Sequence, residues 1–133
     1  MTRHPVLADR TILLAEDEVL ISRYLCRVLE RAGACVTPVR RAADVEALAH
    51  MADRHFDVAL LDVSLEDGSV LPAAELLIQR WVPIVFHSGH DQPVLTTGPT
   101  AWVRALDKPA PTPEIVDALA AQISLPDMQR EIA

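Results

Sequence analysis

The sequence predicts one α/β domain built on a doubly wound, five-stranded parallel sheet. Short apolar segments of strand length alternate with amphipathic segments at helical spacing along nearly the whole chain. This alternation is typical of parallel sheets with helices on both faces and right-handed crossovers between strands. With 133 residues, the chain can bury one hydrophobic core but is too short to fold a second unit beside it. We therefore expect any output domain to lie on another chain.

The first predicted strand is TILLAE (11–16), which is short and apolar and ends abruptly. A helix follows, because apolar side chains recur at helical spacing until Gly33, where the helix is expected to end; they are Ile21, Leu25, Val28 and Leu29. The segment ACVTPV (34–39) is the second strand. Pro38 restricts it to an edge of the sheet or to a strand end, because proline has no N–H to donate.

The middle of the chain predicts a second helix and a central strand. The helix carries its apolar side chains at Val45, Leu48, Ala49 and Ala52. The segment DVALLDV (57–63) is apolar enough to be buried on both faces, as the central strand of a parallel sheet is. Like the first strand, it ends on an acid, Asp62.

The next segments predict a third helix over 71–80, a fourth strand, VPIVFHS (82–88), and a fifth strand, AWVRALD (101–107). The connection between these two strands contains Pro93, Gly98 and Pro99. Because proline breaks a helix, the helix expected in this connection should be short or degenerate.

The sequence also predicts where the domain ends. Pro113 begins a last helix, whose apolar face is formed by Ile115, Val116, Leu119 and Ile123. We expect an N-terminal extension at 1–9, the folded domain at 10–123 and a C-terminal tail at 124–133.

The composition indicates a compact protein and argues against several classes. Half of the residues are hydrophobic and 23% are charged, which is ordinary for a folded domain. The net charge of -7 leaves no basic stripe to displace counterions from a phosphate backbone, so nucleic acid is not an expected partner. No signal peptide and no apolar run of about 20 residues is present, so we expect a cytoplasmic protein without a membrane partner. Cys26 and Cys35 lack metal-ligand or disulfide spacing and are expected to be buried thiols.

Chemically active side chains follow the predicted strands. In open α/β sheets, sites form outside the carboxyl ends of the strands, and here those ends carry Glu16, Asp17, Asp62, Ser88 and Lys108. Carboxylates without a His or Cys cluster suit Mg²⁺. Adjacent acids at the end of a buried strand repel one another unless a cation neutralises them, so a metal site would explain why they occur there. A carboxylate beside this cation and a lysine can be a nucleophile toward phosphorus, and Asp62 is the candidate.

Four segments resemble the receiver domains of two-component response regulators. ILLAEDE (12–18) is similar to their acid-pair segment and DVALLDVSLEDG (57–68) to their phosphoacceptor segment. VFHSG (85–89) is similar to the segment with the switch Ser or Thr, and LDKP (106–109) to the Lys-Pro segment. The four occur in the right order, each at a strand end, and the resemblance covers about residues 10–123.

The resemblance implies a flavodoxin-like sheet order of 2-1-3-4-5 and phosphorylation of Asp62. Asp17, Asp62 and the backbone carbonyl of Ser64 would hold Mg²⁺, while Glu16 would act largely through water. Ser88 would supply the switch hydroxyl.

Two further roles follow from the same resemblance. Lys108 would contact the phosphate and a carboxylate, and its bond to Pro109 would be cis, which only proline makes inexpensive. Ser64 and His90 lie two positions beyond Asp62 and Ser88, where receivers tune dephosphorylation by shaping access of the attacking water.

The chain departs from the receiver pattern after its fourth strand. Receivers commonly place an aromatic residue three positions before the lysine and another after Lys-Pro, where this chain has Ala105 and Ala110. Trp102 either substitutes for the missing switch ring or packs in the core or on the surface. These departures lie on the face that many receivers use for dimerisation or output, so that dimer is not expected here.

The expected function is that of a stand-alone phosphoacceptor. A histidine kinase or histidine phosphotransfer protein would donate the phosphoryl group to Asp62, and the signal would leave by protein contact. We expect no enzyme activity beyond Mg²⁺-dependent self-phosphorylation and autodephosphorylation. The alternative is a receiver-like interaction module that is not phosphorylated. An aspartyl-phosphate phosphohydrolase is a weaker rival, because it would need an acid where the chain has Ser64 and a cap domain that the length does not allow.

Overall fold

The computed structural model describes residues 5–89 and 102–125 and shows a parallel sheet of five strands. In spatial order the strands are β2 (Cys35–Val39), β1 (Thr11–Ala15), β3 (Val58–Leu61), β6 (Ile84–Ser88) and β7 (Val103–Asp107). Neighbouring strands are parallel throughout the sheet. The predicted sheet order of 2-1-3-4-5 is confirmed, since β6 and β7 are the fourth and fifth predicted strands.

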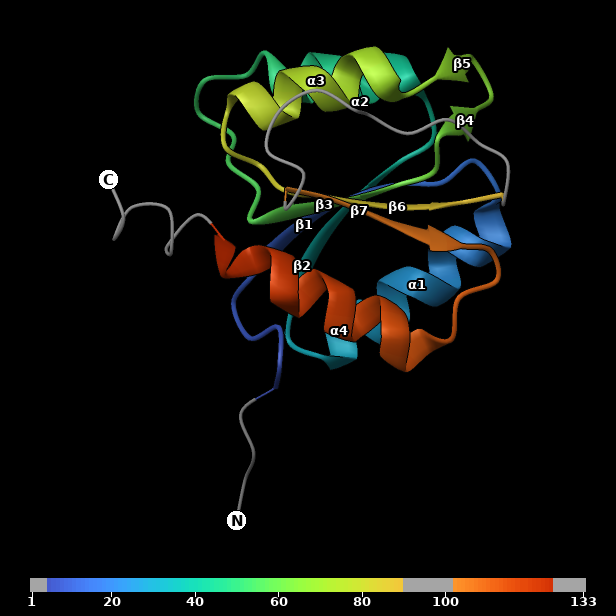
Figure 1. Cartoon of the computed structure of the whole chain (residues 1–133), viewed down its shortest axis with the longest axis vertical. Helices are drawn as coiled ribbons and strands as arrows, with labels where there is room; N and C mark the ends of the chain where they lie inside the picture. Colours follow the sequence, from blue (N-terminus) through green and yellow to red (C-terminus); the bar gives the residue numbers. More distant parts are fainter. Residues whose placement is uncertain (1–4, 90–101, 126–133) are drawn as a thin grey trace.

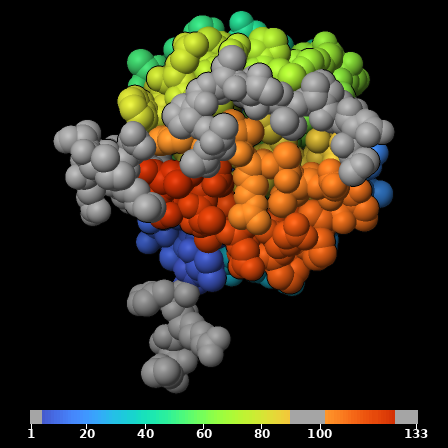
Figure 2. Space-filling model, in the orientation of Figure 1, coloured from blue at the N-terminus to red at the C-terminus, as the bar shows by residue number. Residues whose placement is uncertain are grey.

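Helices cover both faces of the sheet, as Figure 1 shows. They are α1 (Val19–Arg31), α2 (Ala42–Ala49), α3 (Leu71–Gln79) and α4 (Thr112–Ile123). The helices α2 and α3 lie on one face, and α1 and α4 on the other (Figure 1). In the space-filling view, β7 and α4 occupy the middle of the visible face, in orange and red (Figure 2).

The strand residues alternate between two cores because side chains of a strand point to opposite faces. In β1, Leu13 and Ala15 belong to the core under α2 and α3, whereas Ile12 and Leu14 belong to the core under α1 and α4. The strands β3 and β6 divide in the same way. All four residues of β3 are buried, which confirms the prediction that the segment forms a central strand.

The strand β2 lies at an edge of the sheet, which is one of the two placements that Pro38 allowed. The expectation of buried thiols is wrong. Cys35 on this edge strand is exposed, and Cys26 on α1 is only half-buried. An edge strand is covered less completely than a central one, and every residue of β2 is at least partly exposed.

Residues before β1 pack against the turn after α1. The N–H of Leu7 donates to the Ala32 carbonyl, and the Leu7 side chain is buried. Gly33 in this turn has a φ of +102°, and a Cβ there would lie 2.7 Å from Ala8 Cα. The turn therefore requires glycine both for its backbone conformation and for the close approach of this segment.

A small hairpin follows β3 that the sequence did not predict. It pairs β4 (Ser64–Leu65) with β5 (Gly68–Ser69) in antiparallel fashion. The predicted short or degenerate helix before β7 lies outside the described residues. None of the described helices has the length and apolar character needed to cross a bilayer.

Candidate functional site

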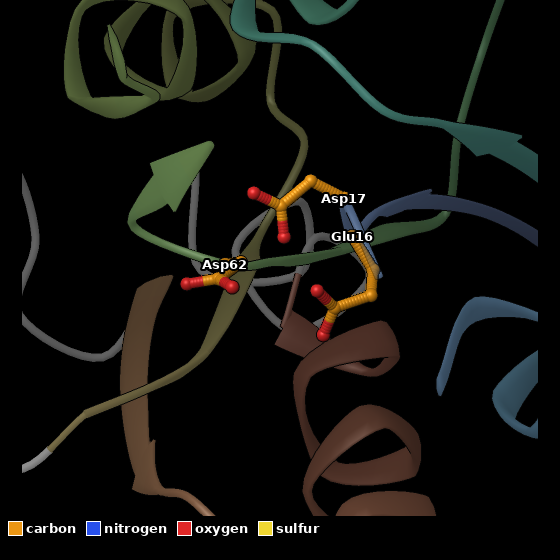
Figure 3. A group of neighbouring side chains, drawn as sticks. All are labelled: Glu16, Asp17 and Asp62. Carbon is orange, nitrogen blue, oxygen red and sulfur yellow. The ribbon is translucent and has the colours of Figure 1, made fainter. Parts of the chain in front are cut away.

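Three carboxylates meet where β1 and β3 end, and Figure 3 shows them turned toward one another. Because β1 and β3 are adjacent and parallel, the residues that follow them arrive side by side. The N–H of Asp62 donates to the Ala15 carbonyl at 2.9 Å, which fixes Asp62 beside Glu16 and Asp17. Each of the three acids offers an oxygen within 4.8 Å of the others. Glu16 is only 2% exposed, while Asp17 and Asp62 are half-buried.

Lys108 brings a cation to this cluster from just beyond the end of β7. Its Nζ lies 2.8 Å from Asp62 Oδ2 and 2.8 Å from Glu16 Oε1. Burial disfavours the charged ammonium, but hydrogen bonds and charge from Asp62 and Glu16 outweigh burial and raise the pKa of Lys108. Lys108 is therefore a fixed positive charge shared by two carboxylates.

Glu16 is the most deeply buried acid of the site. Burial raises the pKa of Glu16, against the lowering effect of the Lys108 hydrogen bond. Its Oε1 accepts from Lys108 Nζ, and its Oε2 accepts from the N–H of Glu18 at 3.3 Å. Both oxygens of Glu16 thus accept hydrogen bonds, and the expectation that Glu16 acts on a metal through water stays a prediction.

The donor set fits a magnesium ion. The cluster consists of Glu16, Asp17 and Asp62 and contains neither His nor Cys. Mg²⁺ prefers carboxylate oxygens and keeps several water ligands, so one or two direct carboxylates suffice. The assignment of this direct role to Asp17 and Asp62 stays a prediction.

The other predicted site residues have different outcomes. Ser64, at the start of β4, donates its N–H to Asp62 Oδ1 at 3.3 Å. Ser88 is 4% exposed at the end of β6, and its carbonyl accepts the Lys108 N–H at 2.8 Å. The metal role of the Ser64 carbonyl and the switch role of the Ser88 hydroxyl stay predictions. His90 lies outside the described residues.

The residues in and around β7 match the receiver pattern at the Lys-Pro bond but lack its aromatic residue three positions before the lysine. The Lys108–Pro109 bond is cis, as predicted. Ala105 is exposed on β7. Trp102 is 3% exposed and packs edge to face on Trp81, with ring centres 5.6 Å apart. Because Trp102 precedes β7 and Lys108 follows it, this ring lies at the opposite end of the strand and has a packing role.

Sequence reasoning missed two side chains near the site. Asp67, in the turn between β4 and β5, accepts the N–H groups of Ala42 and Ala43 at 2.7 and 3.0 Å and thereby caps α2. His87 accepts the N–H of Ala110 on its Nε2 at 3.2 Å. Each contact joins segments more than 20 residues apart, so no local pattern signals it. The Asp67-Gly68 pair is a turn signal, but it does not identify the partners of Asp67.

The sequence and structure are similar to those of known regulatory proteins. No family model matches the chain. It is 32% identical over 116 residues to the swarming motility regulation protein RssB of Serratia marcescens, covering 83% of this chain. The chain spans about half of that relative's length, 51%.

Solved structures are similar over most of the chain. SdrG from Sphingomonas melonis Fr1 is 34% identical with a TM-score of 0.65, over 89% of this chain and 98% of that one. The receiver domain of the sensor histidine kinase PA1611 from Pseudomonas aeruginosa PAO1 is 23% identical with a TM-score of 0.75, over 88% and 99% of the two chains. That structure has a magnesium ion coordinated in its active-site cleft. With the sheet order and the acid cluster beside a lysine, these similarities show that the chain belongs to the receiver domains of two-component response regulators.

Proposed function

We propose that this receiver accepts a phosphoryl group on Asp62 from a phosphohistidine of a histidine kinase or histidine phosphotransfer protein. The observation that carries the proposal is the 2.8 Å contact between Lys108 Nζ and Asp62 Oδ2, next to two further carboxylates. A lysine in this place neutralises charge on an incoming phosphoryl group while leaving the aspartate ionised. The phosphorylated domain then signals by contact with a downstream protein.

The transfer needs no protein group other than the nucleophile to form a bond. An Asp62 carboxylate oxygen attacks phosphorus, the P–N bond to the donor imidazole breaks, and the released imidazole nitrogen takes a proton. The product is a mixed anhydride of the aspartyl carboxyl group and phosphate. Water reverses the modification by attacking phosphorus, which releases inorganic phosphate and restores the carboxylate. Lys108 stays in position through its second contact with Glu16.

Asp17 and Asp62 would hold Mg²⁺ together with the Ser64 carbonyl, and Glu16 would contribute through water. When bound, the ion neutralises charge on the transferring phosphoryl oxygens. The oxygen-only cluster supports this assignment, as does the magnesium ion in the cleft of the similar PA1611 receiver.

We assign the domain no reaction beyond this self-modification. Phosphorylation and autodephosphorylation both take place on Asp62, and Ser64 and His90 are the positions proposed to tune the loss of the phosphoryl group. Phosphorylation adds a charge of about -1.5 to -2 at neutral pH, which the Ser88 hydroxyl and the neighbouring loops would reorganise to meet. The setting proposed for this chemistry is the cytoplasm.

Replacing the nucleophile tests the proposal directly. Wild-type protein incubated with Mg²⁺ and a phosphorylated histidine donor, or with acetyl phosphate, should acquire a base-labile, hydroxylamine-sensitive acyl phosphate that is absent when the metal is chelated. Asp62→Asn should abolish the label, whereas Asp53→Asn, at an exposed loop position, should leave it intact. Equal labelling of the Asp62→Asn protein would refute the assignment.

The rival function, an interaction module that is not phosphorylated, makes a different prediction. Beryllofluoride with Mg²⁺ imitates an aspartyl phosphate and needs a working pocket but no donor. We expect wild-type protein to show amide chemical-shift changes at the ends of β3, β6 and β7. A spectrum that does not change, in a sample that stays folded, would favour the rival.

A further inference from the structure

The chain around Lys108 is held on both sides by two adjacent residues of β6. The N–H of Lys108 donates to the Ser88 carbonyl at 2.8 Å, and the N–H of Ala110 donates to His87 Nε2 at 3.2 Å. Pro109, between them, has no N–H. The first two backbone N–H groups that follow β7 therefore both donate hydrogen bonds to residues of β6.

The two contacts differ in what they require of the sequence. Any residue at position 88 would offer the carbonyl that receives the Lys108 N–H. The contact to Ala110 instead needs a side chain with an acceptor, which His87 supplies. His87 is 8% exposed, and strand alternation places it on the same face as Val85, over the core that also contains Leu106.

His87 can make this contact only in one protonation state. To accept a hydrogen bond on Nε2, the ring must be neutral with its proton on Nδ1. Burial lowers the pKa of His87, and the positive charge of Lys108 lowers it further, although Asp62 acts in the opposite sense. The neutral acceptor is therefore the form that the surroundings favour at neutral pH.

We propose that His87 is a positioning residue for Lys108, which it serves by anchoring the following Ala110 N–H and so holding the lysine at the phosphoryl site. The inference rests on the proposed function, because it concerns the group that meets the phosphate. His87 acts through the chain and touches neither carboxylate in the contacts described. Its effect arises because Lys108 Nζ must reach two oxygens at once, each at 2.8 Å, and a displaced backbone loses that geometry.

A double-mutant cycle separates this role from simple packing. The rate of Mg²⁺-dependent labelling by acetyl phosphate is measured for wild type, His87→Leu, Lys108→Ala and the double variant. We expect His87→Leu to slow labelling on the order of tenfold in the wild-type background. In the Lys108→Ala background it should have less than about a twofold effect, because the group that it positions is gone. Equal slowing in both backgrounds would overturn the proposal.

Two further variants complete the test. His87→Gln retains an acceptor for the Ala110 N–H and should restore most of the rate. His50→Leu removes an exposed histidine at the end of α2, away from the site, and should label like wild type. A His87→Leu protein that labels normally would refute the positioning role while leaving the function intact, whereas loss of labelling in wild type would refute the function itself.

Nitrogen NMR of the unmodified protein gives a result that does not depend on any variant folding. At neutral pH the His87 ring should show a protonated Nδ1 and an unprotonated Nε2, with a hydrogen-bond coupling or a protected amide at Ala110. A ring protonated on Nε2 would overturn the proposal.

Discussion

The Lys108 ammonium lies 2.8 Å from Glu16 Oε1, and Glu16 is 2% exposed. This pair joins the end of β7 to the end of β1, although β3 and β6 separate those strands in the sheet. Because a buried carboxylate without a partner is costly, the lysine stabilises the unphosphorylated site as well as preparing it for phosphate.

Removing the lysine should therefore destabilise the protein before any phosphorylation takes place. We expect Lys108→Met to lower the free energy of unfolding in metal-free buffer at pH 7 by about 1–3 kcal/mol, since Glu16 and Asp62 lose their shared cation. Urea unfolding followed by circular dichroism measures the change. Mg²⁺ should stabilise this variant, because the ion supplies charge that the lysine no longer does. A Lys108→Met protein as stable as wild type would contradict this account of the pair.

A complementary change should have the opposite effect. The cluster of Glu16, Asp17 and Asp62 contains three carboxylates, and Lys108, which pairs with Glu16 and Asp62, supplies one positive charge, so two negative charges are in excess when all are ionised. Asp17→Asn should raise the stability of metal-free protein on the order of 1 kcal/mol by relieving repulsion. It should also reduce the rise in Tm that millimolar Mg²⁺ produces.

The control for this experiment is the next residue along the chain. Glu18→Gln removes an exposed charge of the same sign outside the cluster. It should change neither the stability of metal-free protein nor the rise in Tm with Mg²⁺ appreciably. If Asp17→Asn binds Mg²⁺ as tightly as wild type, then Asp17 is not a ligand.

The fold and the core of the site could be predicted from sequence for a simple physical reason. Strands buried on both faces are continuous apolar runs, and each run in this chain ends at a polar residue that the parallel sheet delivers to one rim. Glu16, Asp62 and Lys108 were identified in this way, and the structure brings them within hydrogen-bonding reach. The edge position of β2 is one of the two placements that the missing N–H of Pro38 allowed.

What escaped prediction depends on contacts between distant segments. The hairpin of β4 and β5 is too short to show strand periodicity, and Asp67 finds its partners 24 and 25 residues earlier in the chain. Cys35 is exposed because β2 lies at the edge of the sheet, and the amino-acid composition does not predict that position. Burial preferences describe a residue type on average, so they fail for a thiol on an edge strand.

Asp67 ties the loop that follows the phosphoacceptor to the start of α2. Its two oxygens accept the Ala43 and Ala42 N–H groups, hydrogen bonds that lower the pKa of the Asp67 carboxyl. The α2 helix has no side-chain cap from its own N-cap residue, Arg41. Asp67→Ala should therefore lower Tm by a few degrees at pH 7. It should also increase hydrogen exchange at the Ala42 and Ala43 amides.

The neighbouring acid of the same turn provides the matched control for Asp67. Glu66→Ala removes an equally charged, exposed side chain and should leave Tm and the exchange of the α2 amides close to those of wild type. The benefit of Asp67 should also diminish as the pH falls. Because the pKa of Asp67 is lower in the folded protein than its ordinary value of 3.8, the carboxylate stabilises the fold at pH values above 3.8 and loses that effect as it takes up a proton. Identical behaviour of the two variants at pH 7 would show that the cap does not contribute.

His87 should make the stability of the protein depend on pH near and below the ordinary histidine pKa of 6.5. Burial lowers its pKa in the folded protein below the ordinary 6.5, with Lys108 adding to the effect and Asp62 opposing it. As the pH falls through 6.5, the unfolded chain therefore takes up a proton before the folded protein does, and stability decreases. The slope attributable to this one group can reach at most about 1.4 kcal/mol per pH unit.

The variant His87→Gln keeps an acceptor for the Ala110 N–H but cannot titrate. Urea unfolding in the presence of a chelator between pH 5 and 8 should therefore show a shallower decline of the free energy of unfolding with falling pH than for wild type. An unchanged slope in His87→Gln would mean that the imidazole titrates alike in the folded and unfolded chains.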